Sequence, residues 1–287
     1  MLKFDKNLSI IHSYLCADGY VIKNPETQKS KYYYIGFRNM NETLLEDFEN
    51  NFYQFFKVNP RRCKDGRTVV QNRALYYLLT QDFSYYSREW ELPELGKDNL
   101  RYWLRAFFDC EGWVLVIKAK NRHIGLDSVN HEGLRNIKLA LERLGIKSKI
   151  AHHRNRTTMR LNVFGKENLI KFQKEMGFLH PAKKKKLQEA IDSYIDYEWH
   201  FPEDEAKLQL FVIAFIKKRS KIDKKFRIRI CSNLEENLVI LSKHLKNMFG
   251  VESKLYGPNY NGIGTKFYEL VVHKTEEVDK CKELFNL

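Results

Sequence analysis

Two acidic residues, Asp18 and Glu111, each stand directly before a glycine at the end of an apolar stretch. The stretches cover residues 8–19 and 103–112. Two carboxylates that lie close together repel each other and lose hydration, so a divalent cation bound by their oxygens would stabilise the pair. If the fold brings the two acids together, they predict a reaction assisted by a divalent metal ion.

Small residues at matching positions indicate how the acids would meet. When the stretches are aligned on their acids, Ser13 matches Ala106 and Ala17 matches Cys110. Side chains four positions apart lie on one face of a helix, and small ones allow a second helix to come close. We therefore expect two helices packed side by side, with both carboxylates at their C-terminal ends. One helix ending in acid and glycine would say little, because glycine ends many helices. The prediction depends on the recurrence of this pattern in both stretches.

The same order of elements follows each stretch: two strands, an amphipathic helix, a basic pair of strands and another helix. The strands that come first cover 20–22 with 31–38 and 113–118 with 123–129, and the amphipathic helices cover 42–57 and 132–144. This order, together with the paired acids, resembles the two-motif LAGLIDADG homing endonucleases over roughly residues 5–195. The resemblance implies an α+β fold of tandem αββαββα half-domains whose antiparallel sheets bind DNA.

The remainder of the chain is interpreted as a third, degenerate repeat of αββ type. Ala214 stands where the first two copies have Ser13 and Ala106, and Arg219-Ser220 replaces the acid and glycine. Such repetition is typical of duplicated supersecondary units. We expect half-domains over 1–97 and 98–197, and an accessory DNA-binding domain over 198–287. Arg219 cannot bind a metal cation, so this copy would hold DNA phosphate, or it would only pack against the others.

The resemblance implies a metal-dependent endonuclease that hydrolyses DNA phosphodiesters. Asp18 and Glu111 would be its catalytic metal ligands, with Mg2+ or Mn2+ as cofactor, and cleavage across the minor groove would leave 3′ overhangs. The resemblance also suggests a catalytic lysine from the run Lys183–Lys186, for which we take Lys184. Because both half-sites are encoded in one chain, we expect a monomer acting on a long, asymmetric double-stranded target.

Strands with alternating polar side chains are the expected DNA contacts, since arginine and asparagine can read guanine and adenine in the major groove. In residues 226–230 the arginines are expected on one face and the apolar residues on the other. A basic hairpin tip at 152–156 would contact phosphate. The predicted DNA-binding residues are Lys31, Tyr33, Arg38, Arg154, Arg156, Arg160, Asn162, Arg227 and Arg229.

Composition agrees with a polyanionic partner. The chain has 50 Lys and Arg against 36 Asp and Glu, a formal net charge of +14, which favours association with nucleic acid. Its 5 cysteines form no Cys-x-x-Cys pair, so the sequence predicts neither a zinc site nor a disulfide framework. The sequence contains no phosphate-binding loop motif, and we expect neither a secretory signal nor a membrane-spanning run. We expect a reducing cytoplasmic location, with an organelle matrix also compatible.

Two alternatives stay open at this stage. The first is an RNA maturase that assists intron splicing, in which the fold and the basic charge would persist after loss of cleavage. The second is a non-catalytic DNA-binding protein on the same fold, against which the presence of both acids argues. The target sequence and the host element (intron, intein or free-standing gene) do not follow from the sequence.

Overall fold

The computed structural model describes residues 2–24, 27–29, 31–117, 121–152, 157–194, 198–223, 226–262 and 265–287. The chain divides into two compact units, Met1–Tyr194 and Ile195–Leu287. In the part of the chain that is described, no helix is long and apolar enough to cross a membrane.

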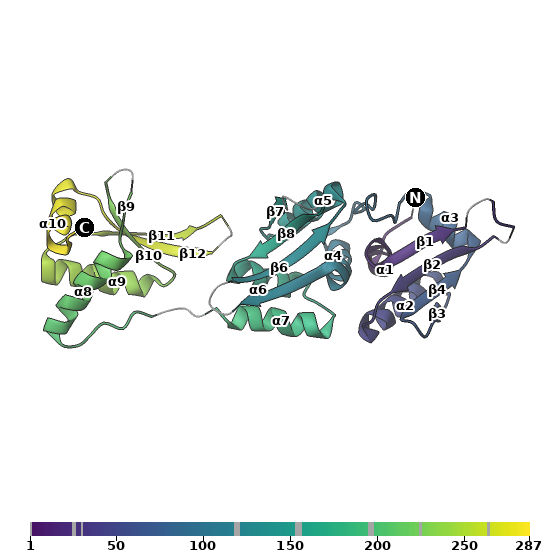
Figure 1. The fold of residues 1–287 in the computed structure, drawn as a ribbon, viewed down its shortest axis with the longest axis horizontal. Helices are drawn as coiled ribbons and strands as arrows, with labels where there is room; N and C mark the ends of the chain where they lie inside the picture. The colour runs from purple at the N-terminus through teal and green to yellow at the C-terminus, as the bar shows by residue number, and fades with distance from the viewer. Residues whose placement is uncertain are drawn as a thin grey trace. The chain divides into compact units, whose positions relative to one another are not determined.

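The first unit contains two copies of one arrangement, each with a four-stranded antiparallel sheet (Figure 1). The first copy has the strand order β1-β2-β4-β3. Its elements are α1 (Lys6–Cys16), β1 (Gly19–Lys23), β2 (Tyr33–Arg38), α2 (Glu42–Phe56), β3 (Arg61–Arg62), β4 (Arg67–Gln71) and α3 (Arg73–Thr80).

The second copy has the equivalent strand order β5-β6-β8-β7 and one additional helix, α7. Its elements are α4 (Lys97–Glu111), β5 (Gly112–Ile117), β6 (Asn121–Ser128), α5 (His131–Arg143), β7 (Lys149–His152), β8 (Met159–Phe164), α6 (Lys166–Glu175) and α7 (Pro181–Asp192). The fold therefore belongs to the predicted α+β class with antiparallel sheets.

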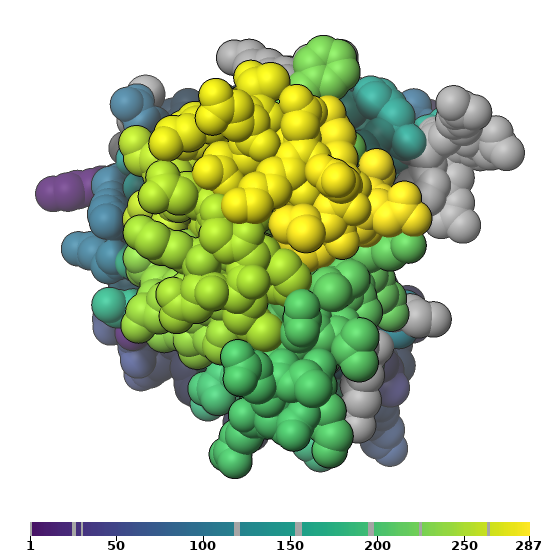
Figure 2. Space-filling model, turned by 90° about the vertical axis from the view of Figure 1, so that its left-hand side faces the viewer, coloured from purple at the N-terminus to yellow at the C-terminus, as the bar shows by residue number. Residues whose placement is uncertain are grey.

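The second unit repeats the whole order of elements, whereas only an αββ-type remnant was expected. Its sheet has the order β11-β12-β10-β9, and α8, α9 and α10 lie side by side at its surface (Figure 2). The elements are α8 (Glu205–Arg219), β9 (Lys221–Ile222), β10 (Ile228–Ser232), α9 (Glu235–Phe249), β11 (Lys254–Tyr260), β12 (Lys266–Val272) and α10 (Thr275–Phe285).

Local sequence accounts for the helix starts in the first unit. Asp5 caps α1 by accepting a hydrogen bond from the backbone N–H of Leu8. Asn41 and Asn130 cap the equivalent helices α2 and α5 in the same way. Asparagine and aspartate are preferred here because their short side chains satisfy N–H groups that have no partner within the helix. The duplicated caps help to give the two copies the same helix geometry.

One hydrophobic core runs through both copies of the first unit, and α1 and α4 lie at its centre. Figure 1 shows these two helices facing each other between the two sheets. Every residue of α1 from Leu8 to Cys16 is buried, since α4 covers one side and the first sheet the other. The second unit has its own core, which includes Val212, Ile216, Leu238 and Leu270.

Candidate active site

Helices α1 and α4 approach each other closely at the predicted small residues. The hydroxyl of Ser13 donates a hydrogen bond to the backbone carbonyl of Trp103, at 2.6 Å. A side-chain to backbone bond between two helices requires a close approach, and Ala106, which is fully buried, leaves room for it. The indole N–H of Trp103 in turn donates to Nδ1 of His12, at 3.1 Å. This packing fixes the C-terminal ends of the two helices relative to each other.

Glycines turn the chain directly from each helix into a strand. A Cβ on Gly19 would lie 2.4 Å from the Cα of Leu15, and one on Gly112 would lie 2.6 Å from the carbonyl oxygen of Phe108. Each strand thus begins against the last turn of its helix, where no larger residue fits. The residue before each glycine, Asp18 or Glu111, is consequently held at the helix end.

The structure brings the two predicted carboxylates into one electrostatic environment. Asp18 is half-buried, and its carboxylate accepts a hydrogen bond from the side-chain amide of Asn39, at 2.9 Å. Burial raises the pKa of Glu111 to about 7, and the negative charge of Asp18 contributes to the rise. Burial, followed by the charge of Asp18, also raises the pKa of the Cys110 thiol on α4. Asp18 on the first copy therefore acts directly on groups of the second copy.

The lysine beside the acids is Lys183, whereas Lys184 was the residue expected from the lysine run. The Lys183 ammonium donates to the carbonyls of Phe108, Asp109 and Cys110 at 3.3, 2.6 and 3.0 Å. These carbonyls form the C-terminal end of α4, whose partial negative charge a cation stabilises. Burial lowers the pKa of Lys183, whereas the charges of Asp18 and Glu111 favour its ionised form. Lys184 is exposed to solvent.

Helical periodicity explains why Lys183 is the residue selected from the lysine run. Leu187 and Ala190, four and seven positions after Lys183, are buried on the inner face of α7. Residues at this spacing share a face, whereas Lys184 is rotated away from it. The signal was present in the sequence, in the apolar residues that follow the run.

Asp109 has a structural role that the sequence reasoning missed. It is buried, and its carboxylate accepts hydrogen bonds from the backbone N–H groups of Leu179 and His180 at 2.9 to 3.2 Å. Burial raises its pKa to about 6, while these bonds and the charge of Arg105 oppose the rise. Since residues 179–180 lead directly into α7, Asp109 positions Lys183 rather than acting in the chemistry itself.

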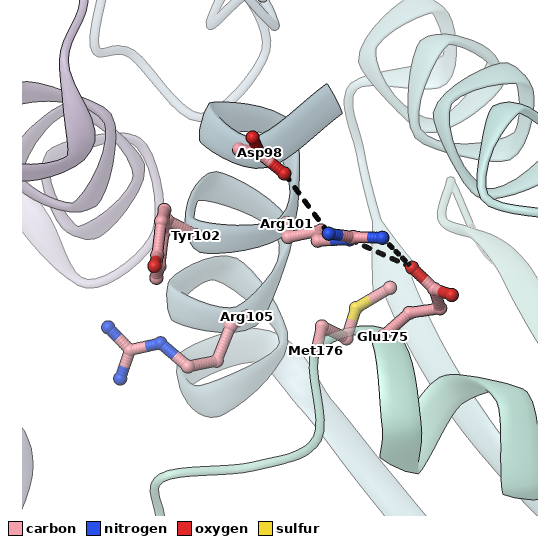
Figure 3. Close-up of a pocket in the computed structure, with 6 residues that line it drawn as sticks. All are labelled: Asp98, Arg101, Tyr102, Arg105, Glu175 and Met176. Carbon is pink, nitrogen blue, oxygen red and sulfur yellow. Dashed lines mark hydrogen bonds and ion pairs between the residues drawn. The ribbon is translucent and has the colours of Figure 1, made fainter. Parts of the chain in front are cut away.

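A separate pocket of about 280 Å3 lies along α4 (Figure 3). Arg101 forms ion pairs there with Asp98 and Glu175, at 3.1 and 2.8 Å. The Arg105 side chain leaves α4 in another direction and pairs with Asp47, at 2.8 Å. Because its arginines are already paired with carboxylates, this pocket offers no free charge for a substrate, and the carboxylate pair is the stronger candidate.

The acids fit a divalent cation that keeps much of its hydration shell. Asp18 and Glu111 supply carboxylate oxygens, which are hard ligands of the kind that Mg2+ prefers. Within the described residues no group of three or more His, Cys, Asp or Glu side chains could enclose a metal ion. Two carboxylates would leave positions for water and for substrate phosphate. A cation between them would offset the cost of burying the Glu111 charge and its repulsion by Asp18, which together raise the pKa of Glu111.

The outer face of the first sheet carries polar and aromatic side chains. Tyr34 and Arg38 lie on this face of β2 with Arg67 opposite Arg38, whereas Ile35 and Phe37 face the core. Lys31 is exposed just before β2. Tyr33 was expected on the DNA-binding face but lies on the opposite one. Its ring centroid lies 5.3 Å from that of Tyr76 on α3, since strand alternation places residue 33 with residues 35 and 37.

The second sheet has the predicted alternation in β8. Met159, Leu161 and Val163 are buried in the core, and Arg160 and Asn162 lie on the other face. Arg160 is already bound to Asp127, its cross-strand neighbour, through two hydrogen bonds of 2.6 and 2.8 Å. Asn162 is buried, and its side-chain oxygen has no hydrogen-bond partner among the described residues. The remaining predicted contacts of this copy, Arg154 and Arg156, lie outside the described residues.

Both sheets contain the same aromatic-glycine pair on the outer face. The ring of Tyr20 lies over Gly36, where a Cβ would come within 2.3 Å of the ring, and the ring of Trp113 lies over Gly125, where it would come within 2.1 Å. The aromatic side chains can lie flat on the sheet only because the opposite residue is glycine. This leaves a smooth outer surface next to each acid-bearing helix end.

The arginines predicted to contact DNA in the second unit are paired with acids. Arg227 binds Asp223 through its guanidinium, at 2.6 and 2.9 Å. Arg229 pairs with Glu269 and lies 3.8 Å from Asp223. Phe226 does not face the core as the alternation predicted: it is 73% exposed with a φ of 55°, because β10 begins only at residue 228.

Several known proteins are similar to parts of this chain. A family model for the LAGLIDADG-like domain matches residues 98–177. The homing endonuclease I-ApeI of Aeropyrum pernix is 26% identical over 178 residues, which are 56% of this chain and 79% of that protein. The replication factor C small subunit of Thermococcus kodakarensis is 36% identical over 94 residues, 32% of this chain. The chain spans only 10% of that relative's length.

Solved structures of homing endonucleases are also similar. The structure of I-DmoI in complex with DNA and Mn covers 59% of this chain and 97% of that one, with a TM-score of 0.45 and 16% identity. I-WcaI bound to its DNA recognition sequence covers 65% and 88%, with a TM-score of 0.43 and 14% identity. The chain therefore contains a match to the LAGLIDADG-like domain at residues 98–177 and is similar to the homing endonuclease I-ApeI over 178 residues.

Proposed function

We propose that this chain is a site-specific homing endonuclease that hydrolyses phosphodiesters of double-stranded DNA with the help of a divalent cation. The observation that carries the proposal is the pairing of Asp18 and Glu111 at the ends of two packed helices, close enough for Asp18 to raise the pKa of Glu111. Paired acids without a compensating cation are costly, so a cation site explains their arrangement. The homologue I-ApeI is itself a homing endonuclease.

In this mechanism Asp18 and Glu111 are the metal ligands, with Mg2+ or Mn2+ as the cofactor. A bound divalent cation would polarise the scissile phosphate, lower the pKa of a bound water and stabilise the leaving 3′ oxygen. Asn39 orients the Asp18 carboxylate through the 2.9 Å hydrogen bond. Lys183 adds a positive charge beside both acids and stabilises the end of α4 that presents Glu111.

The outer faces of the two sheets in the first unit would bind the duplex. Tyr34 and Arg38 belong to one sheet and Arg160 to the other. The pairing of Arg160 with Asp127 restrains its guanidinium, so contact with a guanine would require this ion pair to adjust or the two residues to read the base pair together. Since α1 and α4 of one chain already pair with each other, we propose a monomer with an asymmetric target.

The function is tested by cleavage of a plasmid library that contains candidate insertion sites. We expect double-strand cleavage at one dominant sequence with Mg2+ and none in EDTA. Intact library DNA under all conditions, together with a splicing defect of a host intron when the chain is absent, would reject the nuclease and favour the maturase.

A further inference from the structure

A basic cavity of about 590 Å3 lies in the second unit, between the end of α8 and the outer face of the sheet. The cavity size is within the roughly 300–1,000 Å3 of small-ligand pockets. Basic side chains outnumber acidic ones in its lining, which includes Lys218, Arg219, Lys221, Arg229, Asp223 and Glu269.

Arg219 occupies the geometric place that Glu111 has in the first unit. Gly112 ends α4 with φ −76° and ψ 154°, and its N–H donates to the carbonyl of Phe108, four residues earlier. Ser220 ends α8 with φ −70° and ψ 151°, and its N–H donates to the carbonyl of Ile216, also four residues earlier. The residue before each of these caps, Glu111 in α4 and Arg219 in α8, therefore lies at the same position relative to its helix end. An acid is presented in one unit and a guanidinium in the other.

Several cations of the cavity are not neutralised by the protein. Arg229 pairs with Glu269 and approaches Asp223. Among the described residues, no carboxylate forms an ion pair with Lys218, Arg219 or Lys221. The Arg219 guanidinium lies 5.6 Å from the ring centroid of Phe215, which restrains it. Three clustered cations without a counter-ion repel one another, so an anion would stabilise them.

Stabilisation of the helix end does not account for all of these cations. The C-terminus of a helix carries only about half a negative charge, which one cation in the last turn offsets. Lys217, exposed in the same turn and outside the cavity lining, already supplies one. Lys221 follows the helix on β9, yet it also lines the cavity. The basic residues therefore gather around the cavity rather than around the helix axis.

We propose that this cavity binds a backbone phosphate of duplex DNA and holds it without cleaving it. Arg219 can donate two parallel hydrogen bonds to phosphate oxygens, and Lys218 and Lys221 add point charges. A guanidinium in the place of Glu111 repels a divalent cation, so the second unit would add affinity but no second reaction. Binding at this cavity requires only the duplex and is independent of cleavage by the first unit.

The test compares two charge-matched triple variants of the full-length chain in EDTA, where no cleavage occurs. One removes the cavity cations (K218A, R219A and K221A), and the control removes the exposed lysines K207A, K217A and K243A of the same unit. Fluorescence anisotropy with a labelled duplex gives affinity as a function of salt. We expect the cavity variant to bind about tenfold more weakly than the control. Its salt slope should be flatter by about one unit, since the loss of one neutralised phosphate reduces the slope by about one unit.

Equal affinities and slopes for the two triple variants would overturn the proposal, because the effect would then be one of net charge alone. Loss of affinity for an RNA hairpin but not for the duplex would overturn the assignment to DNA. A thermal shift by inorganic phosphate that only the cavity variant loses, with duplex affinity unchanged, would show a free-phosphate site instead. If the triple variant does not fold by circular dichroism, Arg219→Gln against Lys217→Gln gives the same comparison at one position each.

Discussion

Replacing Glu111 by glutamine should make the metal-free protein more stable while it abolishes cleavage. The pKa of Glu111 is raised from 4.5 to about 7 by burial and by Asp18. The pKa of Glu111 is therefore higher in the folded than in the unfolded protein. Below pH 4.5 Glu111 is protonated in both states, so it does not affect the free energy of unfolding. As the pH rises from 4.5 through 7, ionisation of Glu111 lowers the free energy of unfolding. A neutral amide of similar shape avoids this cost.

The size of the effect follows from the shift. At about 1.4 kcal/mol per pKa unit the rise corresponds to at most about 3.5 kcal/mol, and partial solvent contact reduces the expectation to about 1–2 kcal/mol. For a unit of this size, that is a gain of about 2–8 °C in melting temperature. The gain should be present at pH 8 and absent at pH 4.

The assay is thermal and urea unfolding of wild type and Glu111→Gln in EDTA at pH 4 and pH 8. Glu94→Gln is the matched control, because Glu94 is an exposed glutamate in the same unit. Added Mg2+ should stabilise the wild type more than Glu111→Gln. If Glu111→Gln is no more stable than wild type at pH 8, or gains equally at both pH values, the inferred cost of ionising Glu111 in the folded protein is wrong.

Three further predictions concern the same architecture. Ala106→Leu should lower the free energy of unfolding by about 1–3 kcal/mol in urea titrations, since Ala106 is fully buried between α1 and α4; an unchanged value would mean that the helices separate there. Lys183→Met should reduce the cleavage rate by about 100-fold, whereas the neighbouring Lys184→Met should stay near wild type; equal rates would remove Lys183 from the site. A chain ending at residue 196 should keep both acids and some cleavage, while the slope of log affinity against log salt flattens by about 3–4 units. A soluble truncation with an unchanged slope would contradict a DNA-binding role for the second unit.

The sequence predicted the helix pair and its acids well, because both depend on local patterns. Apolar spacing identified residues 8–19 and 103–112 as helices, and the small residues Ser13 and Ala106 marked the face where they meet. The third repeat was only partly recognised. Its β12 and α10 complete the order of the half-domain, beyond the degenerate αββ-type repeat that was expected.

Side-chain partners were harder to predict, because they depend on pairing between distant segments. The bond of Arg160 to Asp127 follows from the register of β6 and β8, which neither strand reveals alone. The pairing of Arg229 with Glu269 joins β10 to β12 in the same way. The alternation of basic and apolar residues therefore predicts correctly which face of the sheet a basic residue lies on. Whether its charge is already paired with an acid depends on the neighbouring strand, which the alternation does not reveal.

The most direct test of the metal-dependent nuclease is strand cleavage by Asp18→Asn and Glu111→Gln on the mapped target. We expect each variant to lose double-strand cleavage with Mg2+ while its affinity for the target stays within about tenfold of wild type, since the two acids would hold the cation rather than the DNA. Double-strand cleavage at the wild-type rate by either variant would contradict the assignment of these carboxylates as the metal ligands.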